Sequence, residues 1–182
     1  MIPLRLFNIA LLVTLFFYCT HAQAQARGSI GFGAGPALPL ESGYKVGNTW
    51  ALQASARLSN RFALTPTLSI ERIVSQNKGR YNGYYFEGSP RGINLVMLSL
   101  PVRYYITGGV FAALGPTLFV GGEDASSSGI GGTGGIGYDL PVDAHSSFEL
   151  MLHCDRVLVY DHPVALLGLR LTYKFNFRKR KI

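Results

Sequence analysis

The residue types best suited to catalysis lie close together in one short stretch of the chain. His145 and Ser147 stand two residues apart, and Glu149 follows at the same interval. A serine hydroxyl activated by a histidine base, with a carboxylate to orient that base, is the constellation of a hydrolytic nucleophile. However, His145 falls in a predicted short turn, and Glu149 is expected to face the inside of the fold. A hydrolase therefore remains an alternative and is not the expected function.

Metal and nucleotide chemistry find little support in the sequence. The four histidines are His21, His145, His153 and His162, and no pair has metal-ligand spacing with a nearby cysteine or carboxylate set. Residues 129–134 match G-x-G-x-x-G, but a dinucleotide site needs a helix after the motif, and the residues that follow are strand-like. We predict no catalytic residue, no cofactor and no metal, and we expect that the chain is not an enzyme.

Six charged or titratable residues are expected on the inward face of strands, where they need partners. Folding the last hairpin about residues 161–162 places Glu149 across from Lys174 and His153 across from Arg170. Glu71 and Arg103 fall on neighbouring strands, with a long loop between them that hides their register. The predicted charge network, with a structural role, comprises Glu71, Arg103, Glu149, His153, Arg170 and Lys174.

The elements that position these residues are all strand-like. Apolar and polar residues alternate with a period of two, and a convincing 3.6-residue period is missing after the N-terminal segment. Glycine, tyrosine and phenylalanine are abundant, which is typical of β-structure with many turns. The expected strands cover residues 28–38, 47–58, 62–74, 93–106, 110–121, 129–140, 147–159 and 164–177.

The hairpin over residues 94–122 shows the pattern most clearly. Its even positions are apolar on both strands, from Val96 to Ile106 and from Val110 to Val120. A tight turn at Gly108 pairs even positions with even positions, so the two apolar faces form one surface. That surface needs either lipid or a second sheet to cover it.

An even number of strands can close into a ring without a free edge. Short connections are predicted at 59–61, 107–109 and 141–146, and longer ones at 39–46, 75–92 and 122–128; the 160–163 connection departs from this trend. This pattern, together with aromatic residues near strand ends, predicts an all-β, eight-stranded antiparallel up-and-down transmembrane β-barrel with both mature termini on the short-turn, periplasmic side. The face opposite the apolar one carries few charges, which argues against a soluble exported lipocalin-like carrier, the second alternative.

Residues 1–26 have the features of a cleavable signal peptide. Arg5 precedes an apolar run over 6–19 that is shorter than the ~20 residues of a transmembrane helix. Overlapping Ala-x-Ala sites allow cleavage after Ala24 or Ala26. The mature domain would then span 27–182 and keep only Cys154, which excludes an intrachain disulfide.

The net charge of +7 does not indicate a nucleic-acid partner. Four of the 17 basic residues lie in the tail Arg178–Lys181, and the others form no stripe. In the connection 75–92, Tyr81, Tyr84, Tyr85 and Phe86 exceed what a solvated loop needs. Two interpretations stay open for these four aromatic residues: they make surface contacts with a glycan or a protein, or they only continue the strands above the membrane.

Several short motifs resemble the PorT-like outer-membrane β-barrel family (OMP β-barrel domain). The stretch Leu98-Ser99-Leu100-Pro101-Val102-Arg103-Tyr104-Tyr105 is similar to a family block, and Leu114-Gly115-Pro116, Ser69-Ile70-Glu71 and the closing aromatic strand 173–177 resemble others. The tail at 178–181 departs from the usual family terminus. The resemblance implies an outer-membrane location, with membrane lipid and the barrel-insertion machinery as partners and other envelope proteins or glycans as further candidates. It implies no catalytic set. The expected role is envelope structure, surface contact or support of a secretion or transport assembly.

Overall fold

The computed structural model describes residues 28–40, 44–75, 80–81, 84–85, 92–121, 127–143, 145–159 and 162–177. All regular secondary structure in these segments is β-strand. Among them, no helix is long and apolar enough to cross a membrane. The predicted signal peptide, residues 1–26, lies outside the described residues.

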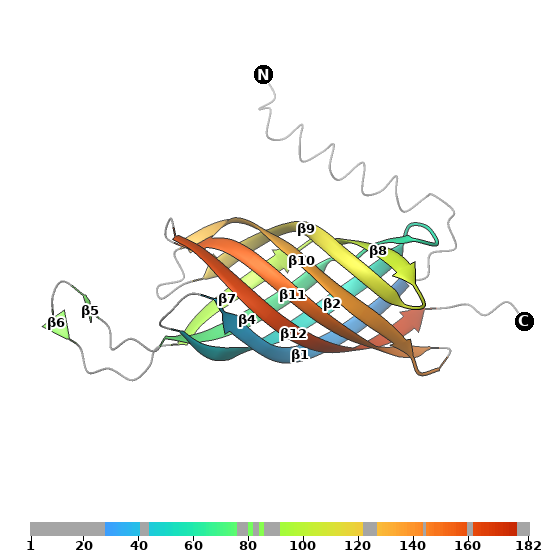
Figure 1. Ribbon diagram of the computed structural model, residues 1–182, viewed down its shortest axis with the longest axis horizontal. Helices are drawn as coiled ribbons and strands as arrows, with labels where there is room; N and C mark the ends of the chain where they lie inside the picture. Colours follow the sequence, from blue (N-terminus) through green and yellow to red (C-terminus); the bar gives the residue numbers. More distant parts are fainter. Residues whose placement is uncertain are drawn as a thin grey trace, which may run out of the picture.

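The described residues hold twelve strands, of which ten form one sheet that closes into the barrel seen in Figure 1. They are β1 (Gly28–Pro39), β2 (Tyr44–Arg57), β3 (Phe62–Leu64), β4 (Thr67–Ser75), β5 (Arg80–Tyr81), β6 (Tyr84–Tyr85), β7 (Gly92–Ser99), β8 (Val102–Thr107), β9 (Val110–Gly121), β10 (Ser127–Pro141), β11 (Ser146–Val159) and β12 (His162–Phe177). The short strands β5 and β6 pair only with each other.

The ring closes because β1 pairs on one side with β12 and on the other with β2, both antiparallel. β4 continues β3, and β8 continues β7, so the ten barrel strands act as eight. Closure gives every strand two neighbours, which removes the unpaired edge of an open sheet. The predicted eight-stranded antiparallel up-and-down ring is therefore confirmed.

Two prolines account for the interrupted strands. Pro66 separates β3 from β4 and Pro101 separates β7 from β8, because proline has no N–H for the ladder. The gap is bridged by neighbouring groups, since the Thr65 N–H donates to the Pro101 carbonyl at 2.9 Å. The pairs Leu64–Val102 and Thr67–Ser99 keep one register across the break. The breaks therefore leave the ring continuous.

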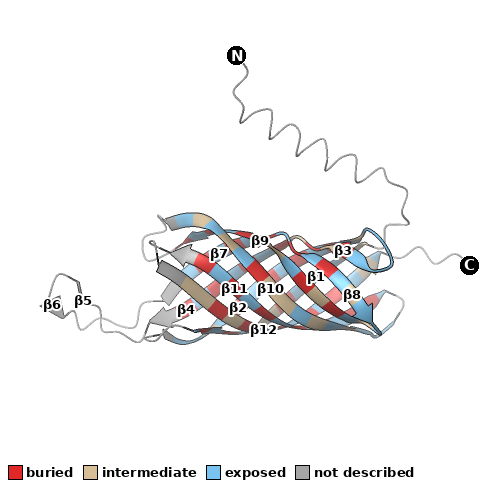
Figure 2. Cartoon of the chain, turned by 45° about the horizontal axis from the view of Figure 1, so that its top comes forward, coloured by how far each residue is buried: buried red, intermediate tan, exposed pale blue. Residues whose placement is uncertain are grey.

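Side chains alternate between the two faces of the ring as the sequence predicts. Leu98, Leu118 and Leu171 are about half exposed, at 50%, 50% and 52%, whereas Glu149 and Lys174 are 0% and 4% exposed. Figure 2 shows the same alternation of buried and exposed residues along each strand. The apolar face points outward and the buried charged residues point inward, which is the reverse of a soluble carrier; Arg72 and Arg156 are exceptions that lie exposed on the outer face.

The register predicted for the 94–122 hairpin is confirmed, but that of the last hairpin is wrong. Leu98 lies opposite Leu118, and Val102 opposite Leu114, as the turn at Gly108 requires. In β11 and β12, however, Glu149 lies opposite Thr172, and Lys174 lies opposite Ser147. The prediction was off by two residues. A shift of two keeps every side chain on its own face, so alternation alone cannot detect it.

The connections differ in length from the prediction. β2 begins at Tyr44, so residues 40–43 suffice to join it to β1, and residues 122–126 join β9 to β10. The long connection is the one between β4 and β7. Gly28 pairs with both Phe177 and Ala56, so the two ends of the described chain lie at the end of the ring that carries the short turns.

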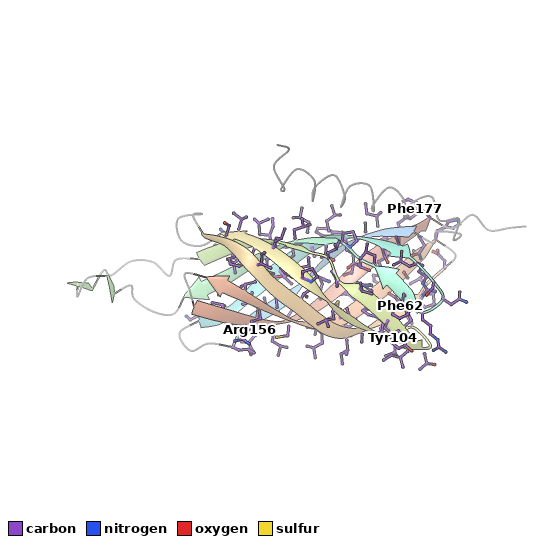
Figure 3. The ribbon with its side chains drawn as sticks, turned by 90° about the horizontal axis from the view of Figure 1, so that it is seen from above. Phe62, Tyr104, Arg156 and Phe177 are labelled. Carbon is purple, nitrogen blue, oxygen red and sulfur yellow. The ribbon has the colours of Figure 1, made fainter. Side chains whose placement is uncertain are left out.

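Outward aromatic side chains gather at that short-turn end. Phe62 packs against Tyr104 with ring centroids 5.2 Å apart, and Phe148 packs against Tyr173 at 5.4 Å. Figure 3 shows Phe62, Tyr104 and Phe177 toward one end and Arg156 toward the other. Tyr105, next to Tyr104 in the chain, points inward and donates a hydrogen bond to Asp139.

The corrected register predicts which cysteine pair can be cross-linked on the outer face. In a chain with Cys19 and Cys154 replaced by alanine, Leu150→Cys with Leu171→Cys should form a disulfide on mild oxidation, because these residues are directly opposed. Leu150→Cys with Tyr173→Cys should stay reduced, since a diagonal pair exceeds the reach of a disulfide, about 7 Å between Cα atoms. Intact mass after thiol alkylation distinguishes the outcomes. If only the Leu150→Cys, Tyr173→Cys pair cross-linked, the register predicted from the sequence would be correct and that of the structure wrong.

Candidate functional site

The interior of the ring is the part of the described chain in which polar and charged side chains converge. The inward side chains of β11 pass through it in order from the short-turn end: Ser147, Glu149, Met151, His153, Asp155 and Val157. Along this path they meet four successive layers of groups from the other strands.

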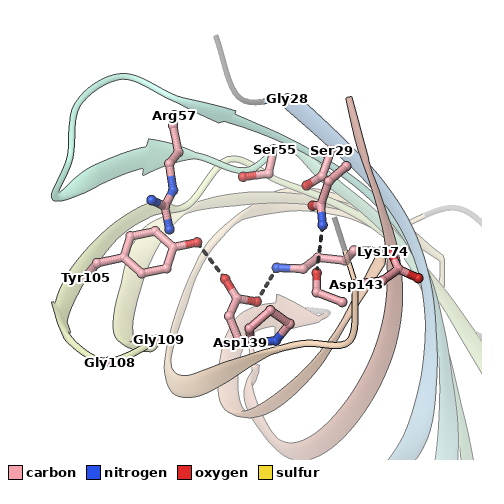
Figure 4. A pocket seen from close by; sticks show the side chains of 13 residues that line it. Gly28, Ser29, Ser55, Arg57, Tyr105, Gly108, Gly109, Asp139, Asp143 and Lys174 are labelled. Carbon is pink, nitrogen blue, oxygen red and sulfur yellow. Dashed lines mark hydrogen bonds and ion pairs between the residues drawn. The ribbon is translucent and has the colours of Figure 1, made fainter. Parts of the chain in front are cut away.

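At the short-turn end the interior opens into a cavity of about 320 Å³, shown in Figure 4. The Tyr105 hydroxyl donates to Asp139 Oδ2 at 2.8 Å, and Lys174 Nζ pairs with the other carboxylate oxygen of Asp139. The Arg57 guanidinium lies 4.3 Å above the Tyr105 ring. The cavity wall thus carries both cationic and carboxylate side chains, and its charge favours neither an anionic nor a cationic ligand.

The second layer is an ion pair that spans the interior. Arg103 donates two hydrogen bonds to Glu149, from Nη1 at 2.5 Å and Nη2 at 2.8 Å. Gln53 donates to Glu149 Oε2 at 3.1 Å and accepts from Arg103 Nη2 at 3.3 Å. Lys174 Nζ lies 3.1 Å from Glu149 Oε2, and the Arg103 guanidinium lies 4.4 Å above the Phe111 ring. Four strands, β2, β8, β11 and β12, are joined through one carboxylate.

The third layer holds a second set of titratable groups. His153 Nδ1 lies 2.7 Å from Asp155 Oδ2, and the Thr49 hydroxyl donates to Glu71 Oε1 at 2.5 Å. Arg170 Nη2 lies 3.6 Å from Met151 Sδ, and among the described residues it forms no ion pair. A small cavity of about 10 Å³ lies beside His153, Asp155 and Arg170.

The fourth layer, at the loop end, is apolar. Side chains from five strands pack together there and are almost fully buried. They are Ile73, Leu95, Met97, Phe119, Val157 and Leu166. The interior is therefore not polar throughout, because this layer closes its loop end with hydrocarbon.

The six residues of the predicted charge network are all buried, and they fall into two groups. Arg103, Glu149 and Lys174 are in direct contact, whereas Glu71 and His153 lie in the third layer. Arg170 lines the small cavity between the groups. The pairing of His153 with Arg170 is wrong: Gly168 lies opposite His153, and Met151 opposite Arg170.

The sequence prediction missed Gln53, Asp139 and Asp155. Asp155 follows His153 by two residues on the same strand face, so alternation could have included it. Asp139 and Gln53 lie on the inward faces of strands that show few other charges, and their contacts come from strands that are distant in the sequence. Gly168 makes room for the His153 ring, because a Cβ at that position would overlap it.

The constellation around His145 forms a turn, and it does not form a nucleophile–base pair. Asp143 accepts hydrogen bonds from the backbone N–H groups of His145 and Ser146, at 2.6 and 2.7 Å, and from the Ser146 hydroxyl at 2.6 Å. These donors, the Ser146 hydroxyl first, lower the pKa of Asp143 below its ordinary value. The His145 ring stacks on Phe175, and Glu149 is held by Arg103 inside the ring.

Two other predicted features can be placed. Residues 129–134 lie within β10, which turns directly into β11, so the G-x-G-x-x-G match has no helix after it. Tyr81, Tyr84 and Tyr85 belong to β5 and β6, but their side chains lie outside the described structure, as does Phe86. Their role in surface contact stays a prediction.

The fold is shared with solved eight-stranded outer-membrane β-barrels. Ail of Yersinia pestis is 16% identical, with a TM-score of 0.53 over 84% of this chain and 99% of Ail. OprG of Pseudomonas aeruginosa is 10% identical, with a TM-score of 0.59 over 85% and 98%. Neisserial surface protein A is 15% identical, with a TM-score of 0.54 over 82% and 97%. No protein-family model and no curated protein matches the chain. The chain has the fold of these small outer-membrane barrels.

Proposed function

We propose that the chain is an integral outer-membrane β-barrel protein with a polar, ion-paired interior and no enzymatic activity. The observation that carries the proposal is the inversion of its faces. Large apolar residues on every long strand are about half exposed on the outside, while Arg103, Glu149 and Lys174 are buried inside. An exposed apolar surface of this extent around a closed ring fits a hydrocarbon environment.

Ring closure supports the same environment. A backbone N–H or C=O without a partner costs several kcal/mol in hydrocarbon, and a closed ring leaves none at an edge. The aromatic residues at the short-turn end would lie at one membrane interface, where their rings meet the headgroups. We place that end, with both mature termini, on the periplasmic side after removal of residues 1–26.

The role that fits a closed interior is structural or adhesive. The Arg103–Glu149 layer and the apolar layer leave no wide passage, which favours envelope structure, surface contact or support of a secretion or transport assembly. The resemblance to PorT-like proteins points the same way. Membrane lipid and the barrel-insertion machinery are the implied partners, and nucleic acid is not.

A glycan is one candidate for the surface contact. Ail was solved in complex with sucrose octasulfate, a heparin analogue. On this chain the candidate contact segment is the connection between β4 and β7, which holds Tyr81, Tyr84, Tyr85 and Phe86. Other envelope proteins are equally compatible with such an aromatic segment.

The alternatives fit the geometry less well. A soluble lipocalin-like carrier needs its apolar side chains to converge inside, and Leu98, Leu118 and Leu171 point outward. A lipid-modifying hydrolase needs a base beside its nucleophile, and the His145 ring stacks on Phe175.

Fractionation tests the location directly. The protein should sediment with outer membranes, resist extraction by salt, and migrate differently in gel electrophoresis before and after boiling, because a closed barrel in detergent stays folded until heated. Release by salt alone, with no change on boiling, would favour the soluble carrier. Hydrolysis of a labelled lipid by the wild type, and no hydrolysis by His145→Ala, would favour the hydrolase.

A charge placed on the outer face tests the lipid contact. Leu152 is 43% exposed and lies near the middle of β11, whereas Ile106 lies near the short-turn end. In phospholipid vesicles, Leu152→Arg should lower the free energy of unfolding by about 2–4 kcal/mol, and Ile106→Arg by about 0–1 kcal/mol. Urea titration in vesicles measures both. Equal, small effects at the two positions would mean that water covers this face.

Breaking the buried ion pair tests the interior. Arg103→Met leaves the Glu149 carboxylate buried without its bidentate partner, and it should cost about 3–5 kcal/mol of stability. Adding Glu149→Gln should recover part of that loss, because the unpaired charge is then removed. The matched control is Arg61→Met at the exposed short turn, which should change stability little. If Arg103→Met and Arg61→Met lowered the free energy of unfolding by the same amount, the Arg103–Glu149 layer would not stabilise the ring.

A further inference from the structure

Three potential metal ligands meet inside the barrel from opposite walls. One ligand atom each from Glu71, His153 and Asp155 lie within 4.8 Å of one another, and all three residues are buried. His153 and Asp155 stand on β11, whereas Glu71 stands on β4, four strands away around the ring in either direction. The sequence could not indicate this set, because Glu71 is far from the other two along the chain.

The cluster is held in position but is incompletely satisfied. The Thr49 hydroxyl fixes Glu71 through Oε1, while Glu71 Oε2 has no hydrogen-bond partner among the described residues, although the side chain is only 1% exposed. His153 Nε2 also has none within this part of the chain. His153 Nε2 lies against Gly168, so the open position that faces the cluster is Glu71 Oε2. Buried polar atoms normally have partners, and this unpaired carboxylate oxygen points to a missing ligand.

Space for a small ligand lies beside the cluster. The cavity of about 10 Å³ is lined by two of the three cluster residues, His153 and Asp155, and by Arg170, whereas Glu71 is not part of its lining. That volume is at the lower limit for one water molecule or ion.

The charges of the cluster favour a cation. Glu71 and Asp155 carry two carboxylates, and Arg170 supplies one full positive charge nearby, without an ion pair to either within the described residues. His153 already shares a 2.7 Å contact with Asp155 through Nδ1. A metal ion can take the place of the proton in such a contact, because imidazole and carboxylate ligate in their deprotonated forms.

We propose that Glu71, His153 and Asp155 bind a divalent transition-metal ion that links the opposite walls of the barrel. One imidazole and two carboxylates suit Zn²⁺ or Mn²⁺, with bonds of about 2.0–2.2 Å. Because the ligand atoms lie within 4.8 Å of one another, small side-chain movements bring them onto one ion. Metal binding by these three residues requires only that the ring is closed, and so it is independent of the proposed function.

Metal content after refolding tests the site. The full mature chain is refolded from urea into detergent with Zn²⁺ or Mn²⁺ and dialysed, and metal per folded protein is measured by mass spectrometry of the element. The wild type should retain about one ion per barrel. Glu71→Gln, Asp155→Asn and His153→Gln should each lower retention by about tenfold or more, because each removes a ligand.

Asp139→Asn is the matched control, since Asp139 is an interior carboxylate that pairs with Lys174 at the other end of the ring. It should keep the wild-type metal content. The difference in melting temperature between Zn²⁺ and a chelator should be present in the wild type and the control and absent in Glu71→Gln. Migration before and after boiling verifies that each variant is folded. A wild type that retains neither metal, or ligand variants that retain as much as the wild type, would overturn the proposal.

Discussion

The constraint on which this structure depends is that every long strand has a hydrogen-bonded neighbour on both sides. Closure of β1 onto β12 completes the ring and leaves no edge, so successive side chains face outward and inward in turn, except at the register shifts near Lys45 and Tyr105. The two proline interruptions show how strict the requirement is. The ladder at Pro66 and Pro101 is bridged by backbone bonds from Thr65 and Leu100, and the register continues across the gap.

Closure also decides how the interior charges are satisfied. A carboxylate such as Glu149 cannot reach water, so its partners come from other strands across the ring: Arg103, Gln53 and Lys174. Once such a network is buried, removal of one member costs more than the bond itself, because the remaining charge is left unpaired. The ion-paired layer and the apolar layer both lie across the interior, and a cavity of about 320 Å³ remains at the short-turn end.

The two buried charge clusters differ in how completely they are paired. In the Arg103–Glu149 layer both carboxylate oxygens of Glu149 are bonded and the one open position among the described residues is the donor Arg103 Nε, whereas in the second cluster a carboxylate oxygen, Glu71 Oε2, is open. Both connect strands that are not neighbours in the ring. Cross-wall contacts of this kind resist flattening of the barrel, which strand pairing alone does not prevent. A metal ion in the second cluster would complete the same mechanical function that Glu149 already performs in the first.

The sequence by itself determined the eight strands, their antiparallel order and the face that each residue occupies, because a two-residue alternation is local and needs no information from distant segments. It also indicated the register of the hairpin around Gly108 from Leu98–Leu118 to Val102–Leu114, although a register shift next to the turn pairs Thr107 with Val110. Only the tertiary structure decided the register of β11 against β12, since a shift of two residues preserves every face. It alone decided that Arg103 meets Glu149 and that Glu71 meets His153, because contacts across the ring depend on how all eight strands tilt and close together.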